Sequence, residues 1–498
     1  MAYVDTLIIG AGVSGLGIAA HLTRHHPQRS LAILERRSKI GGTWDLFKYP
    51  GIRSDSDMLT FGFNFKPWNK DSVLASAAAI KQYLNEVIDE YHLSNKIHFE
   101  QRVLSANYDS EQQQWSVEVQ QNDGSIQTWH SQFLLGCTGY YNYDQGYQPE
   151  FVGQENFKGQ WVHPQHWPEH LDYQGKKVVV IGSGATAMTV VPALANSGVG
   201  HVTLLQRSPT YVLSIASGDA LYQKARQVLP ETWAYRAMRA RNIGLQRAMY
   251  VFARKQPKLM RNLLLHLVKQ QLEGKVDLKH FRPDYQPWDQ RLCVVPNGDL
   301  FTALKSSQAD IVTDQIERIT EQGILLQSGQ QLEADIIVCA TGLQIQVLGG
   351  LDLSVDGQRI DYGQSMLYRG MMLSNVPNLA IAVGYTNSPW TLKVDLVADY
   401  LSRLFTYMQQ HHFTEVVAKN IGVEQHTDTV MNGLNSGYLQ RAVQLLPKQG
   451  KHPLWQVGSD YLKDRFSLKR APFEDEALRF KTATQAQRAN AARHGQIG

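Results

Sequence analysis

The sequence predicts an α/β fold with two β-α-β domains and a helical insertion. Three observations predict it. A pattern of strand, glycine-rich turn, helix and strand occurs twice, with its first glycine at Gly10 and again at Gly182. A helix-rich, arginine-rich segment follows the second copy. Finally, 498 residues are too many for one ordinary hydrophobic core.

The first copy has the spacing of a dinucleotide-binding turn. Gly10 suits the tight turn, Gly12 lets a pyrophosphate approach the helix N-terminus, and Gly15 lets helix and strand pack closely. Glu35 ends the second strand of the unit, where a carboxylate accepts hydrogen bonds from a free ribose 2′-hydroxyl. This turn therefore suits FAD or NAD.

The second copy differs at the decisive position. Its turn is Gly182-Ser183-Gly184-Ala185-Thr186-Ala187, and the position equivalent to Glu35 is occupied by Arg207, next to Ser208. A guanidinium there suits a 2′-phosphate through a charge-assisted contact. Two unlike Rossmann-like sites predict electron transfer from NADPH to a flavin, FAD.

Domain boundaries follow from these units. The FAD-binding domain is expected at 1–145 and 334–475, the NADP-binding domain at 152–210 and 286–333, the helical insertion at 211–285 and a loosely held tail at 476–498.

Composition excludes several classes of function. A net charge of +4 gives no support for nucleic-acid binding. Three widely spaced cysteines, Cys137, Cys293 and Cys339, fit reduced thiols, and they exclude a disulfide framework, a zinc site and the redox pair of a disulfide reductase. The first residues lack signal-peptide character and no apolar run reaches the ~20 residues of a membrane span, so a cytoplasmic enzyme is expected.

A loop after Glu35 is a candidate flavin contact. Gly42, Thr43, Trp44 and Asp45 combine small residues, an indole and an acid, a composition consistent with backbone against an isoalloxazine ring. An ordinary surface turn has the same composition, so this alternative stays open.

The segment Phe157-Lys158-Gly159-Gln160-Trp161-Val162-His163-Pro164-Gln165-His166-Trp167-Pro168 resembles the FxGxxxHxxxWP fingerprint of type I Baeyer–Villiger monooxygenases. The resemblance covers nearly the whole chain, and segments such as 41–57 and 288–299 are similar to the ethionamide-activating branch of that family. It implies that His163 and Trp167 act in coupling the domains around the cofactors. The alternative is that His163 has only a structural role, with its hydrogen bonds made within the protein.

The resemblance also implies a catalytic pair. Family members carry an active-site arginine at the position of Arg291 and pair it with an aspartate at the position of Asp55. A permanent cation in a water-poor pocket stabilises an oxygen anion. A structural salt bridge is the alternative. Many relatives have lysine where this chain has Gln290, so the binding of NADPH is expected to depend more on Arg207 and Ser208.

The implied activity is conversion of a ketone to an ester or lactone with NADPH and O2 through a C4a-peroxyflavin, with oxidation of sulfides or thioamides as a second activity. An N- or S-oxygenating flavin monooxygenase is the rival enzyme, and a non-catalytic redox-sensing flavoprotein is the rival from another class.

The basic stretch has three interpretations. Residues 217–280 hold 13 Lys or Arg against four acids. We expect a solvated helix face whose apolar side, including Trp233, Met238, Met249, Phe252 and residues 263–265, lines the substrate pocket. Weak attachment to an anionic membrane is the third interpretation.

Overall fold

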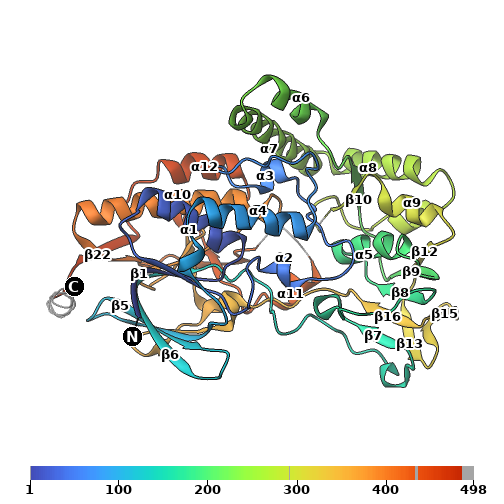
Figure 1. Ribbon diagram of the computed structural model, residues 1–498, viewed down its shortest axis with the longest axis horizontal. Helices are drawn as coiled ribbons and strands as arrows, with labels where there is room; N and C mark the ends of the chain where they lie inside the picture. Colours follow the sequence, from blue (N-terminus) through green and yellow to red (C-terminus); the bar gives the residue numbers. More distant parts are fainter. Residues whose placement is uncertain (1, 291, 432–435, 485–498) are drawn as a thin grey trace.

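The computed structural model describes residues 2–290, 292–431 and 436–484. Figure 1 shows two sheet-based bodies side by side, with the helices of the insertion lying over both. The first and the last strand of the chain, residues 2–9 and 478–482, belong to the first body, which carries the first glycine turn.

The first body is built on a mixed sheet with strand order β18-β17-β4-β5-β6-β1-β2-β3, and β21 extends it beside β6. Its strands are β1 (Ala2–Ile9), β2 (Leu31–Leu34), β3 (Ile97–His98), β4 (Arg102–Asp109), β5 (Gln114–Gln120), β6 (Ile126–Gly136), β17 (Asp352–Val355), β18 (Gln358–Arg359) and β21 (Leu379–Ile381). β3, β2, β1, β6 and β21 run parallel. Parallel strands need crossover helices, which cover the sheet.

Alternation along β1 shows why this sheet is buried on both faces. Ile8 belongs to the core shared with the covering helices, whereas Leu7 and Ile9 belong to the core on the opposite face. The helices are α1 (Val13–His25), α4 (Ala77–Glu90) and α10 (Trp390–Gln410). α1 thus lies directly after β1, with its N-terminus at the edge where the parallel strands end.

The second body is a parallel sheet of order β12-β9-β8-β16-β7. Its strands are β7 (Gln160–Val162), β8 (Lys177–Ile181), β9 (His201–Gln206), β12 (Ala309–Thr313) and β16 (Ile336–Cys339). Helices α5 (Ala185–Ala195) and α9 (Asp299–Lys305) pack on one face, and the meander β13 (Ile316–Thr320), β14 (Gly323–Leu326) and β15 (Gln331–Glu333) packs on the other.

Two expected boundaries move. β16 pairs with β7 and β8, so the second domain continues through Cys339 instead of ending at residue 333. β25 (Leu478–Thr482) pairs with β22 (Phe413–Ala418), so the chain is still held in a sheet beyond residue 476. In both places a short strand finds its partner far away in the sequence, which local composition does not reveal.

The insertion contains α6 (Ala220–Val228), α7 (Glu231–Lys255) and α8 (Pro257–Leu272), as expected, together with strand β10 (Val212–Ile215), which pairs with β11 (Cys293–Pro296). α7 lies over α3 (Met58–Phe61) of the first body, whereas α8 contributes Val268 and Leu272 to the core of the second. The insertion therefore connects both bodies.

The remaining elements complete the first body: α2 (Thr43–Leu46), α11 (Gly437–Arg441), α12 (Tyr461–Lys469), β19 (Leu367–Tyr368), β20 (Met372–Leu373), β23 (Gln425–Thr429) and β24 (Lys448–Gly450). Within residues 2–290, 292–431 and 436–484, no helix is both long and apolar enough to cross a bilayer.

Candidate active site

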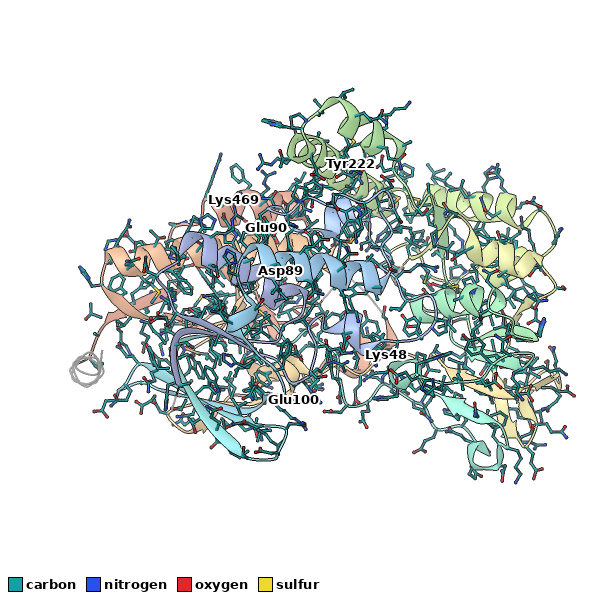
Figure 2. All side chains as sticks on the ribbon, viewed as in Figure 1. Lys48, Asp89, Glu90, Glu100, Tyr222 and Lys469 are labelled. Carbon is teal, nitrogen blue, oxygen red and sulfur yellow. The ribbon has the colours of Figure 1, made fainter. Side chains whose placement is uncertain are left out.

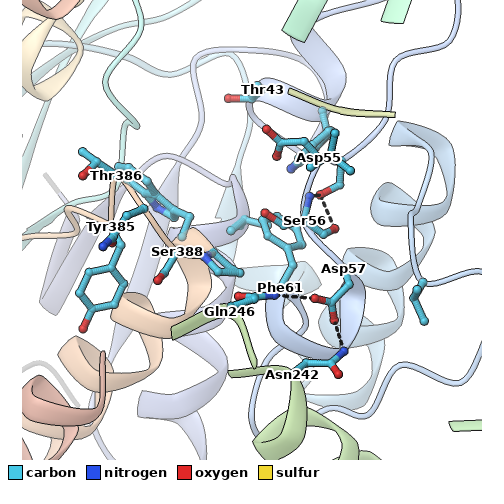
Figure 3. A pocket seen from close by; sticks show the side chains of 18 of the residues that line it. Thr43, Asp55, Ser56, Asp57, Phe61, Asn242, Gln246, Tyr385, Thr386 and Ser388 are labelled. Carbon is cyan, nitrogen blue, oxygen red and sulfur yellow. Dashed lines mark hydrogen bonds between the residues drawn. The ribbon is translucent and has the colours of Figure 1, made fainter. Parts of the chain in front are cut away.

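A cavity of about 710 Å³ lies where the first body, the insertion and the segment before β11 meet. Its floor is the first glycine turn with the loop Gly41–Trp44. Its walls come from residues 54–57, from Tyr385–Trp390 and from apolar side chains of the insertion and β11, including Leu213, Met249 and Val294. Figure 3 shows Thr43, Asp55 and Tyr385 around it. The site thus joins segments that are far apart in the sequence.

The first glycine turn has the geometry that the sequence predicts. Gly10 has φ = +104°, and a Cβ there would lie 2.7 Å from the carbonyl oxygen of Cys137. A Cβ on Gly15 would lie 1.9 Å from the carbonyl oxygen of Gly10. Gly12 is the N-cap of α1, and no side chain caps the helix there. The backbone N–H groups of α1's first turn therefore suit a pyrophosphate.

Glu35 stands beside this turn. Its side chain is buried, its Oε2 accepts the Ala11 N–H at 2.8 Å, and its Oε1 accepts the Arg37 N–H at 2.9 Å. Burial raises the pKa of this carboxyl, and the two backbone hydrogen bonds partly offset that rise. A recess of about 70 Å³ lined by Glu35 shares Gly12, Gly42 and Tyr143 with the large cavity. The two hollows together suit an extended dinucleotide with its adenosine ribose at Glu35.

Gly15→Ala tests the turn. Because the added methyl group would meet backbone, the strand or helix must shift, at a typical cost of about 1–3 kcal/mol. We expect flavin affinity to fall about ten- to hundredfold, measured as the ratio of visible flavin absorbance to protein. Gly244→Ala, on α7 where a Cβ would meet nothing within 4 Å, should keep full flavin content. Wild-type flavin content in Gly15→Ala would contradict this assignment.

The loop after Glu35 divides into two roles. Gly42, Thr43 and Trp44 line the cavity, as expected of a flavin contact. Asp45 instead turns into the protein, where its buried carboxylate pairs with Arg37 at 2.6 Å and Lys81 at 2.9 Å. Burial alone would raise the pKa of Asp45, but the hydrogen bonds from these two cations lower it overall. The structure therefore gives Asp45 a supporting position behind the loop.

The following residues join the two bodies. Phe47 and Tyr49 are buried in the core of the second body. Tyr49 packs beside Thr186, and burial raises the pKa of its phenol to about 12. Arg53 forms an ion pair with Asp299, the first residue of α9, at 3.0 Å. Next along the chain, Asp55 lines the cavity. The segment is thus an inter-domain contact that ends in the site.

The second glycine turn repeats the first. Gly182 has φ = +140°, and a Cβ there would lie 2.4 Å from the carbonyl oxygen of Ala340. Gly184 is the N-cap of α5 without a side-chain cap, and it is exposed together with Ala185. Thr186 follows in the first turn of α5. Arg207 and Ser208 are exposed just after β9, so an incoming 2′-phosphate could reach them from solvent.

His163 and Trp167 lie where the chain passes between the bodies. The two connecting segments run side by side: the Asn142 N–H donates to Gln344 O at 2.8 Å and the Gln346 N–H to Tyr140 O at 3.0 Å. His163 packs so closely on Gly146 that a Cβ there would lie 2.0 Å from its Cε1. Burial lowers the pKa of His163, which favours its neutral ring. Trp167 packs against the second core.

Arg291 lies outside the described residues, but its neighbours along the chain are described. Trp288 and Leu292 line the cavity. The segment before it is anchored by Asp289, whose carboxylate accepts the Gln286 N–H and pairs with Arg254 of α7 at 2.7 Å. The insertion therefore holds the segment that carries the predicted catalytic arginine.

Two sets of cavity residues are not predicted by the sequence. On one wall, Asn242 and Gln246 of α7 donate to the two carboxylate oxygens of Asp57, at 3.1 and 2.8 Å (Figure 3). On another, Trp390 begins α10 and donates from Nε1 to the Ser14 hydroxyl at 2.8 Å. The i, i+4 spacing of Asn242 and Gln246 indicates one helix face, but nothing local connects it with Asp57.

The apolar side of the insertion is only partly as predicted. Met249 lines the cavity, together with Leu245. Trp233, Phe252 and Leu263 do not line it, and 64, 42 and 48% of their surfaces are exposed. These side chains occupy the outer faces of α7 and α8, because the inner faces are taken by buried residues such as Tyr235 and Leu264.

The fold and site together define a flavoprotein with two dinucleotide-binding domains and a largely apolar cavity at the first. The chain belongs to the flavin-binding monooxygenase-like family, whose model matches residues 5–409. The predicted α/β fold, the flavin cofactor and the enzyme class, a flavoprotein monooxygenase, are confirmed.

Relatives match along nearly the whole chain. A protein named "Probable FAD-binding monooxygenase AlmA" from Acinetobacter baylyi is 59% identical, covering 97% of each chain. The FAD-containing monooxygenase EthA of Mycobacterium tuberculosis is 48% identical, covering 96% of this chain and 98% of its own. Among solved structures, a steroid monooxygenase bound to NADP has a TM-score of 0.77 at 22% identity, covering 97% of this chain and 100% of its own.

Proposed function

We propose that this protein uses NADPH and O2 to convert ketones to esters or lactones, with oxidation of sulfides or thioamides as a second activity. FAD and NADP are its cofactors: relatives are named as FAD-containing monooxygenases, and the two glycine turns differ as these nucleotides require. The observation that carries the proposal is the cavity itself, which runs from the first glycine turn to the segment flanking Arg291.

The residues present fit FAD. The uncapped N-terminus of α1 suits the pyrophosphate, Glu35 suits the ribose, and Gly42 to Trp44 leave cavity space for a ring system. FAD, when bound, supplies the redox and oxygen chemistry. The protein supplies binding, orientation and the exclusion of water.

The cavity walls support the proposed substrate class. Leu213, Met249 and Val294 give the cavity apolar surface, which favours an apolar substrate over water. Arg291 is proposed as the catalytic cation, held by the carboxylate of Asp55, which lines the same cavity. Attack on a ketone carbonyl develops negative charge on oxygen, which a fixed cation would stabilise.

Product analysis tests the proposed reaction. The flavin-loaded enzyme is given NADPH, air and an equimolar pair of substrates, an apolar ketone and an apolar sulfide. The proposal expects an ester or lactone from the ketone and faster NADPH consumption when the ketone is present. Sulfoxide without any ester would favour the N- or S-oxygenating alternative, and consumption that no substrate accelerates would favour a redox sensor.

Arg207→Ala tests the second nucleotide site. A charge-assisted hydrogen bond typically contributes about 1.5–3 kcal/mol, so KM for NADPH should rise about ten- to hundredfold, while KM for NADH should change little. Lys176→Ala, an exposed cation of the same domain, is the matched control and should leave both values unchanged. Equal effects of Arg207→Ala on the two coenzymes would refute a role in binding the 2′-phosphate.

A further inference from the structure

The outer surface of the insertion has an unusual concentration of exposed apolar side chains. Of the seventeen large apolar side chains that are exposed in the described part of the chain, nine lie between residues 221 and 267. They are Leu221, Val228, Leu229, Trp233, Leu245, Phe252, Leu259, Leu263 and Leu267. We call the outer surface of α6–α8 that carries them the insertion face.

These side chains follow the helical repeat. Leu259, Leu263 and Leu267 are spaced four residues apart along α8, and 56, 48 and 37% of their surfaces are exposed. On α6, Leu221, Lys224 and Val228 are exposed at spacings of three and four, whereas Tyr222 on the inner side is fully buried and donates to Trp68 O (Figure 2). α6 and α8 therefore each have a buried stripe on the inner side and a second, exposed stripe with apolar side chains on the outer side.

The segment that forms this surface has an excess of positive charge that the rest of the chain lacks. Residues 217–280 hold 13 basic and four acidic residues, whereas the rest of the chain holds 36 basic against 41 acidic. Several of these cations are exposed and have no carboxylate partner among the described residues: Lys224, Arg236, Lys255, Lys258 and Lys269. Lys255 and Lys258 flank the junction of α7 and α8, next to Phe252 and Leu259.

This charge pattern indicates what kind of partner binds the insertion face. Two copies of such a face would repel each other, so self-association through it is disfavoured. An anionic bilayer fits, since apolar side chains enter the interfacial region and lysines contact lipid phosphates. In Figure 1, α6, α7 and α8 lie along one edge of the molecule, away from both sheets, where a flat surface can approach them.

The insertion face is also continuous with the cavity. Leu245 of α7 lines the cavity, yet 61% of its surface is exposed. It lies one turn before Met249, which lines the cavity too, and two turns before Phe252 on the outer surface. A bilayer on this face would therefore lie next to the cavity wall formed by α7.

We propose that the insertion face docks the protein on anionic phospholipid membranes, with the cavity opening beside the lipid. The apolar stripe of α8 and the end of α7 enters the interface, and Lys255 and Lys258 contact headgroup phosphates. Apolar compounds dissolved in the bilayer could then reach the cavity without crossing water. The proposal rests on exposure and charge, and it stands whichever substrate the cavity takes.

Flotation with vesicles tests it. The flavin-loaded enzyme is mixed with vesicles of phosphatidylcholine alone or with phosphatidylglycerol added. We expect it to float with the anionic vesicles, to stay behind with the neutral ones, and to be released by high salt. Lys255→Gln/Lys258→Gln should weaken binding roughly thirtyfold, at about fivefold for each lysine near the surface. Leu259→Ser/Leu263→Ser should weaken it at least as much.

Matched controls lie on the far side of the molecule. Ile126→Ser/Val152→Ser removes two apolar side chains that are at least as exposed as Leu263, and Lys158→Gln/Lys176→Gln removes two exposed lysines. Both should bind like wild type, and flavin content and melting temperature check that every variant is folded. No flotation of wild type, equal binding by all variants, or a dimer that Leu259→Ser/Leu263→Ser dissociates would each overturn the proposal. The readout needs no turnover, so it is independent of the proposed reaction.

Discussion

Replacing Arg291 with alanine is expected to lower formation of the oxygenated product about 10²–10³-fold while NADPH still reduces the flavin at the wild-type rate. A fixed cation matters most where negative charge develops on oxygen in a cavity that excludes water, and removal of one such group typically has an effect of this size. Flavin reduction requires no charge on oxygen. The measurement pairs product yield in air with the rate of anaerobic bleaching.

Arg282→Ala is the control, since Arg282 is an exposed arginine shortly before the same segment, and its loss should leave both rates intact. Arg291→Lys should recover only part of the product, because a point charge lacks the planar fork of a guanidinium. If Arg291→Ala made the oxygenated product at the wild-type rate, Arg291 would have no catalytic role.

Replacing Arg239 with methionine is expected to destabilise the fold by about 3–5 kcal/mol. Arg239 of α7 is buried, pairs with Asp395 of α10 at 3.0 Å, and donates to the carbonyl oxygens of Leu59 and Gly62 at the end of α3. The methionine would leave the buried carboxylate of Asp395 without its cation, with the Asn64 N–H still donating to it, and would remove a donor from the carbonyl oxygens of Leu59 and Gly62. Thermal or denaturant unfolding measures the loss, and Arg236→Met, at an exposed position on the same helix, should change stability little.

The loss should depend on pH. Burial raises the pKa of Asp395 to about 6, although Arg239 opposes the rise. Because the unfolded value is about 3.9, the folded state binds more protons than the unfolded state between these values, so this group favours folding more as the pH falls. Arg239 lowers the pKa of Asp395, so its loss raises that pKa further above 6. The deficit of Arg239→Met should therefore be largest at high pH, shrink as the pH falls toward 6, and level off below it, where the carboxyl is protonated in both proteins. A deficit independent of pH would contradict this.

Local patterns predicted the nucleotide units well. Both glycine turns, their strands and the roles of Gly10 and Gly15 as close-packing positions depend only on residues that are near each other in the chain, and the structure shows them as expected. Glu35 is likewise placed by its distance along a single β-α-β unit.

Long-range pairing was not predictable in the same way. Asp45 had the composition of a flavin contact but forms ion pairs with Arg37 and Lys81, the latter on α4. β16 joins the second sheet by pairing with β7 and β8. Because these partners lie much earlier in the chain, the local sequence does not reveal the pairing. Phe252 and Leu263 had the pattern of a pocket wall, yet helical periodicity shows only that a face is apolar. Whether that face meets protein, solvent or lipid depends on the tertiary arrangement.

The central claim is that one nucleotide at the first glycine turn receives electrons from another at the second. The most direct measurement is anaerobic mixing of the purified, FAD-reconstituted protein with NADPH while the visible flavin absorbance is followed. The account predicts a yellow protein that NADPH bleaches much faster than NADH does, with the colour restored by air. A protein that takes up no flavin, or whose bound flavin NADPH leaves oxidised, would contradict it.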